Sequence, residues 1–154
     1  MMRRRVLWAF AALALSSCSD VQVGGSLGEV YPLGFDSVRI RLYSSSLSVE
    51  YVRTDGAVPI RVTADRAAIE AGGTIDLSAA GDVTGRTASG REIPRFNEGE
   101  LKLDSFRVED GARVEGSWSA SFPVGDTDTL GADGRFSARL DIIEDPGPTP
   151  PGRE

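Results

Sequence analysis

The 154-residue sequence contains no histidine, a single cysteine and a single lysine. Without histidine, the chain lacks the commonest general base, the commonest transition-metal ligand and the usual partner of a catalytic serine. A lone cysteine can form no disulfide within the chain, and without histidine it cannot complete a zinc site. We therefore expect no enzymatic activity, no cofactor and no bound metal.

Long apolar runs are also scarce, because only residues 6–15 pass ten positions without a polar side chain. Three consecutive arginines, residues 3–5, precede this run. A basic segment followed by a short apolar one is typical of a secretory signal. As a helix, ten residues would rise only about 15 Å, roughly half the hydrocarbon thickness of a bilayer. The run therefore predicts export rather than a membrane-spanning helix.

The lone cysteine directly follows this signal, in the sequence Leu15-Ser16-Ser17-Cys18. These residues resemble the lipobox of bacterial lipoproteins, in which an apolar residue and two small residues precede an obligatory cysteine. The resemblance implies that the Cys18 thiol receives a diacylglyceryl group and that residues 1–17 are removed as a signal peptide. Because two or three acyl chains anchor a protein stably where one does not, Cys18 would tether the chain to a membrane.

The resemblance also bears on location and charge. Ser19 follows the cysteine, whereas an Asp there tends to retain Gram-negative lipoproteins in the inner membrane. This favours the periplasmic face of the outer membrane or the cell surface, although Asp20 stands one position later. Loss of residues 1–17 would change the formal net charge from −6 to −9, and an acidic protein is a poor nucleic-acid binder.

Composition divides the remaining chain into three parts. Residues 18–33 are rich in glycine and small polar residues, which predicts a lipidated flexible tether. Residues 34–143 have the length and pattern of one β domain. Residues 144–154 contain recurrent proline, which predicts a disordered tail.

Alternation of apolar and polar residues is the main signal in the β domain. It predicts strands in eight segments: 37–43, 47–53, 58–63, 74–78, 82–86, 100–108, 113–122 and 134–143. The short segment 82–86 is expected at a sheet edge. The period breaks at Asp104-Ser105, which predicts a β-bulge. Only residues 64–73 have a helical pattern, with Asp65 as N-cap and Gly72 as stop.

The last two segments resemble each other, because Gly116 and Trp118 match Gly134 and Phe136 eighteen residues later. We expect one antiparallel pair, in which each glycine leaves room for a ring from a neighbouring strand. Asp133-Gly134 also has the composition of a hairpin turn, which would start the second strand.

Eight short strands and one small helix predict an all-β fold, an antiparallel β-sandwich, with a small barrel as the alternative. Gly116-Ser117-Trp118 resembles the G-x-W motif of lipocalins, which is the basis of the lipocalin-like barrel as an alternative, whereas Trp118 is itself expected to pack in the core. In that family, however, the motif lies on the first strand.

Outward positions of neighbouring strands carry Arg39, Arg41, Arg53 and Arg61. They predict a basic patch for an anion or a partner, or else cross-strand pairing with Glu50 and other acids.

Together these patterns predict a lipid-anchored envelope lipoprotein that acts as a structural or protein-interaction module, with the membrane and an envelope protein as partners. The alternative is a lipoprotein that binds an apolar small molecule or a sugar in a barrel. An interior void above about 300 Å³ would favour the alternative, and a filled core would favour the module.

Replacement of Cys18 by alanine tests the anchor. We expect the C18A precursor to remain uncut and to incorporate no labelled palmitate, because the thiol that accepts the lipid is gone. Labelling of cells followed by immunoprecipitation measures this. Continued lipid incorporation by C18A would contradict the predicted anchor.

Overall fold

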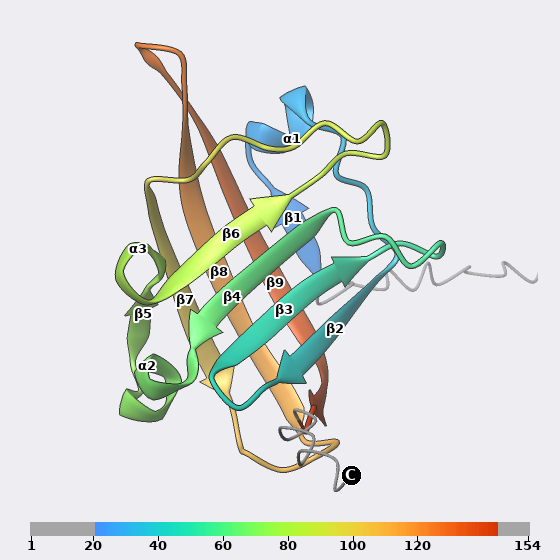
Figure 1. Ribbon diagram of the computed structural model, residues 1–154, viewed down its shortest axis with the longest axis vertical. Coiled ribbons are helices and arrows are strands. Elements are labelled where there is room, and N and C mark those ends of the chain that lie inside the picture. Colours follow the sequence, from blue (N-terminus) through green and yellow to red (C-terminus); the bar gives the residue numbers. More distant parts are fainter. Residues whose placement is uncertain (1–20, 145–154) are drawn as a thin grey trace, which may run out of the picture.

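The computed structural model describes residues 21–144 and shows an all-β domain with three short helices (Figure 1). The strands are β1 (Gln22–Gly24), β2 (Ser37–Leu42), β3 (Ser46–Val52), β4 (Ile60–Asp65), β5 (Thr74–Asp76), β6 (Gly81–Gly85), β7 (Glu98–Ser105), β8 (Arg113–Val124) and β9 (Asp128–Ile142). The helices are α1 (Leu27–Val30), α2 (Arg66–Ala71) and α3 (Leu77–Ala80). None of the helices within residues 21–144 is long and apolar enough to cross a membrane.

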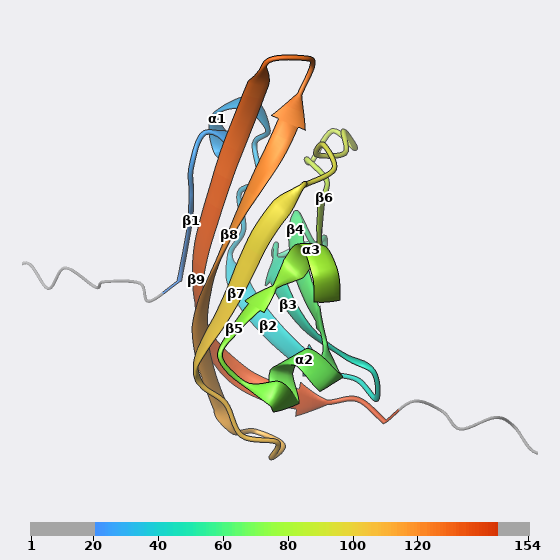
Figure 2. The same ribbon diagram turned by 90° about the vertical axis from the view of Figure 1, so that its left-hand side faces the viewer.

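All strands belong to one curled sheet. The order is β5-β7-β8-β9-β2-β3-β4-β6, with β1 added beside β9. Neighbouring strands are antiparallel except β2 and β9, which run parallel. Figure 2 shows the sheet turned over on itself, so that β7, β8 and β9 face β2, β3 and β4. The predicted all-β class is confirmed: two facing layers, as in a sandwich, are joined into the nearly closed path of a small barrel.

The alternating residues of each strand fill the space between the two layers. On β3, Leu47, Val49 and Tyr51 are fully buried, and they form one continuous core with residues of β8 and β9. The predicted bulge is present, since the register of β7 against β8 shifts between Leu103 and Ser105. The predicted helix is α2, and α1 and α3 were not predicted.

The expected antiparallel pairing of the two similar segments is confirmed, and its register places each glycine opposite an aromatic ring. Gly116 on β8 lies opposite Phe136 on β9, and Trp118 lies opposite Gly134. A Cβ atom at Gly116 would stand 2.6 Å from Phe136 Cζ, and one at Gly134 would overlap the Trp118 indole. Each glycine therefore makes room for the ring across the ladder. The predicted turn at Asp133-Gly134 is wrong, because β9 begins at Asp128 and carries both residues within the strand.

Tyr51 joins the two layers through the core. Its hydroxyl accepts a hydrogen bond from Trp118 Nε1 at 2.9 Å and donates one to the Arg135 carbonyl at 3.0 Å. The Tyr51 ring also makes edge-to-face contacts with the rings of Phe35 and Trp118, at centroid distances of 4.9 and 6.2 Å. Burial raises the pKa of Tyr51 well above its ordinary value.

Residues 22–26 are tied to β9. β1 pairs with Asp133, Gly134 and Arg135 of β9. Just after β1, the Ser26 hydroxyl accepts a hydrogen bond from the backbone N–H of Gly131 at 3.0 Å.

Three apolar side chains of the same segment, Leu27, Tyr31 and Leu33, are buried in the core. The predicted flexible tether is therefore wrong for residues 21–33. The many small residues around them suggested a linker, but these apolar side chains cover one end of the curled sheet. The predicted lipid-attachment residue and the tail beyond Glu144 lie outside the described residues.

The contribution of α1 can be measured with two substitutions on the same helix. Leu27 is 1% exposed, so L27A should lower the free energy of unfolding by about 2–3 kcal/mol through lost burial and a cavity. Val30 is 45% exposed, and V30A should change it by less than about 0.5 kcal/mol. Denaturant unfolding of both variants measures the difference. Equal effects would contradict the packing of α1 into the core.

Candidate functional site

The curled sheet does not close with a complete ladder, because β5 and β6 are the two ends of its strand order. α3 lies between these ends in the chain and packs against β5, β6 and β7. Leu77 of α3 is fully buried, and Gly99 of β7 is close enough that a Cβ there would stand 3.4 Å from Leu77 Cδ1. A helix thus fills part of the seam that an additional strand would occupy.

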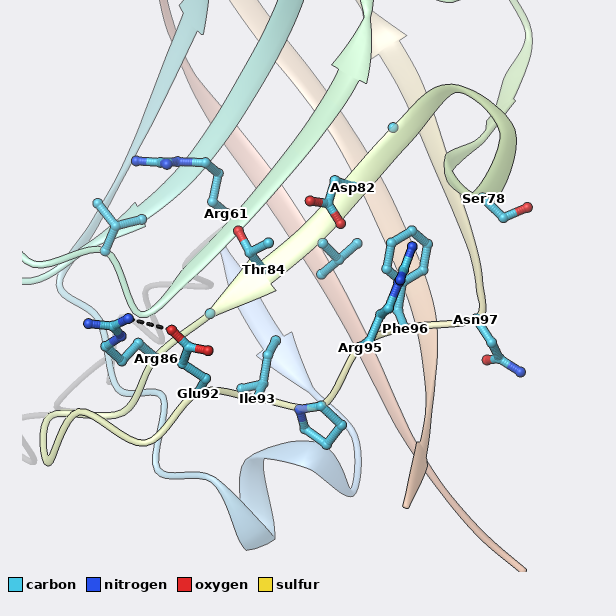
Figure 3. Close-up of a pocket in the computed structure, with 15 residues that line it drawn as sticks. Arg61, Ser78, Asp82, Thr84, Arg86, Glu92, Ile93, Arg95, Phe96 and Asn97 are labelled. Atoms are coloured by element: carbon cyan, nitrogen blue, oxygen red, sulfur yellow. Dashed lines mark hydrogen bonds and ion pairs between the residues drawn. The ribbon is translucent and has the colours of Figure 1, made fainter. Parts of the chain in front are cut away.

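A groove of about 980 Å³ lies along this seam, between β6 and the segment 92–97 that leads into β7 (Figure 3). One end is bounded by an ion pair between Arg86 and Glu92, which also form an isolated β-bridge. Ser78 of α3 lines the groove as well. The groove is therefore a wedge: the two chain segments pair beside Arg86 and then separate toward α3.

One backbone edge of β6 faces this wedge. Arg86 N–H donates to the Pro59 carbonyl next to β4, and bonding positions alternate along an antiparallel ladder. Thr84 and Asp82 consequently bond toward β4, whereas Gly85 and Val83 direct their backbone groups the other way. The Gly85 carbonyl indeed accepts from Ile93 N–H at 3.1 Å. Within the described part of the chain, no strand pairs with Val83 on that side.

The side chains of the groove combine an apolar floor with separated charges. Ile93 and Phe96 are half-buried and pack against the core. Asp82 on β6 and Arg95 on the facing segment are exposed, and neither forms an ion pair with another residue in the range 21–144. Such a surface offers apolar contact, one free carboxylate and one free guanidinium, beside the unpaired backbone of Val83, which is itself 2% exposed.

Asp76 holds α3 at the seam. Its Oδ1 atom accepts hydrogen bonds from the Ser78 N–H at 2.9 Å and from the Ser78 hydroxyl at 2.6 Å. These bonds hold the pKa of the Asp76 carboxyl below its ordinary value. The ionised carboxylate is the N-cap of α3. It stabilises this helix, which is only one turn long.

Two of the predicted patch arginines meet on the outer face of the sheet. Glu50 of β3 lies between Arg39 of β2 and Arg61 of β4 in the ladder. Arg39 Nε donates to Glu50 Oε2 at 2.7 Å, and Arg61 Nε donates to Glu50 Oε1 at 3.1 Å. The arginine stems cover the carboxylate, which is only 2% exposed. Arg39 and Arg61 therefore pair across the strands with Glu50, as the second of the two expectations predicted.

The other two arginines lie elsewhere. Arg41 approaches Asp141 of β9 with 3.8 Å between Nε and Oδ2, and Arg53 pairs with Asp55 at 2.7 Å beyond the end of β3. All four arginines therefore have a carboxylate beside them. Cys18 and the lipobox residues Leu15, Ser16 and Ser17 lie outside the described residues.

The strand pattern predicted β6 as an edge, and the sheet order confirms this position. It did not predict the groove residues Asp82, Arg95 and Phe96 as a site. The last two lie in a loop without periodicity, and only the curl of the sheet brings them opposite β6.

Comparisons of the chain with protein-family models, with curated proteins and with solved structures found no match.

The Arg39–Glu50–Arg61 cluster can be tested by neutralising its carboxylate. We expect E50Q to lower the free energy of unfolding by about 1.5–3 kcal/mol, because two charge-assisted interactions of a buried group are lost. The control is E70Q, which removes an exposed i,i+4 pair with Arg66 and should cost at most about 0.5 kcal/mol. Chemical denaturation measures both. A loss in E50Q no larger than in E70Q would show that the cluster does not stabilise the fold.

Proposed function

We propose that this protein is a lipid-anchored envelope lipoprotein that acts as a protein-interaction module without catalysis. In this proposal Cys18 carries the lipid, and the free edge of β6 in the seam groove binds an extended segment of an envelope protein. Strand addition to an exposed edge is a common mode of peptide recognition, in which main-chain hydrogen bonds give affinity and neighbouring pockets give specificity.

The observation that carries the proposal is the unpaired edge at Val83 inside a groove. Exposed edges are normally covered or blocked by charge, proline or a bulge, since they invite pairing with other chains. Here the wedge between β6 and the segment 92–97 limits access to one extended chain. Ile93 and Phe96 supply the apolar contacts that such a chain would bury.

The filled interior also supports an interaction module over a carrier of ligands. Large side chains that are fully buried, including Tyr51, Phe122 and Phe136, occupy the space between the layers.

A second candidate is a small molecule bound in the seam groove itself. Its volume of about 980 Å³ falls in the range of small-molecule sites. The free Asp82 carboxylate and Arg95 guanidinium could orient a polar ligand such as a sugar.

A photo-crosslinking residue at Thr84, which is exposed on β6, tests the first candidate in whole cells. We expect a discrete crosslinked protein that is lost in the V83P background, because proline removes the N–H directed at the groove. The matched control is V83A, which trims the same side chain but keeps the N–H and should retain the product. A crosslinker at Ser119, on the outer face of β8, should give none.

Crosslinking that is equal in V83P and V83A would contradict strand addition. If instead the purified protein retains a small molecule in native mass spectrometry and D82N or R95Q releases it, the second candidate is correct.

A further inference from the structure

The start of the described chain is held at one place on the surface. β1 pairs with Asp133, Gly134 and Arg135 of β9, and the buried Leu27 follows three residues after β1. Val21, directly before β1, also packs against the core. The chain that leads back to Cys18 must therefore leave the domain beside Arg135.

Very little chain separates this place from the proposed lipid. Cys18 precedes Val21 by three residues, and consecutive Cα atoms are 3.8 Å apart. The two Cα atoms can therefore be at most about 11 Å apart. An anchor this short cannot hold the domain away from the bilayer, so the surface around the start of β1 must lie next to the headgroups.

The charges on this surface suit phosphate groups. Arg135 and Arg139 are exposed on β9, where Arg135 lies opposite Ser117 and Arg139 lies opposite Arg113. Arg135 forms no ion pair within residues 21–144. Arg139 donates to the Gly111 carbonyl at 3.1 Å and forms no ion pair with any residue in the described range.

Two of the acids near these two arginines are paired with other arginines. Glu115 on β8 is bound by Arg113 at 2.6 Å, and Asp141 lies beside Arg41. Asp133, two residues before Arg135 and opposite Gly24, forms no ion pair within residues 21–144. Two available guanidinium groups thus flank the place where the chain enters the fold, on a protein whose overall charge is negative.

We infer that the outer face of β8 and β9 around Arg135 and Arg139 lies against the phosphate headgroups of the bilayer that holds the anchor. This inference rests on the proposed lipidation of Cys18. It also orients the rest of the molecule. Figure 2 shows β1 and β9 on one side of the domain and β6 on the other, so the seam groove opens away from the membrane.

The test uses the lipidated protein reconstituted in vesicles of phosphatidylcholine and phosphatidylglycerol that contain a quencher attached to lipid headgroups. A single dye is placed by S117C on the outer face of β8 or by T84C on β6. Lipidated Cys18 has no free thiol, so the introduced cysteine alone is labelled. We expect strong quenching of the dye at residue 117 and weak quenching at residue 84.

Charge is tested in the S117C protein with a matched pair of variants. R135Q/R139Q should reduce the quenching at residue 117, because the headgroup contacts are lost. R53Q/R66Q removes the same charge elsewhere and should leave the quenching unchanged. Equal reduction in both double variants would overturn the role of Arg135 and Arg139.

Flotation separates failure of the orientation from failure of the anchor. If the protein floats with the vesicles but residues 117 and 84 are quenched equally or in the reverse order, the inferred orientation is wrong and the anchor stands. If the protein does not float and mass spectrometry finds an unmodified Cys18, both the anchor and the orientation are wrong.

Discussion

The fit of two rings over two glycines, at the pairing of β8 with β9, is the constraint on which the rest of the fold depends. Trp118 and Phe136 each lie across the ladder from a glycine, so that both rings enter the core where side chains would otherwise collide. Trp118 then reaches Tyr51 on the opposite layer and donates a hydrogen bond to its hydroxyl. One sheet is thereby held in a curl by contacts between strands far apart in the sequence.

This curl explains why the seam is open. The bulky core residues hold the two layers apart, and the strand order ends at β5 and β6 without a ladder between them. α3 and the segment 92–97 fill part of the gap, which leaves the Val83 edge and the groove beside it. The proposed interaction site is thus a consequence of incomplete closure. The Val83 backbone on this edge has no ladder partner on the groove side, although the residue as a whole is only 2% exposed.

On the side of the molecule opposite the seam, the sheet is covered rather than open. β1 and α1 attach the beginning of the domain to β9 and cover one end of the sheet. If Cys18 carries lipid, the short connection between Cys18 and β1 means that the anchor also fixes the orientation of the domain on the membrane. A domain on a long tether would sample all orientations, whereas this one would present its seam groove in one direction.

The sequence by itself determined the all-β class, the bulge in β7, the edge position of β6 and the glycines opposite rings, because alternation and steric room are local properties of a strand. The signal and lipobox remain predictions from the sequence, with Cys18 as their test. Only the tertiary structure decided that residues 21–33 belong to the core, that Asp133-Gly134 lies within a strand, and that Glu50 holds Arg39 and Arg61 together. It also placed Arg95 and Phe96 opposite β6. These outcomes depend on which distant segments the curl of the sheet brings together, and no local period in the sequence carries that information.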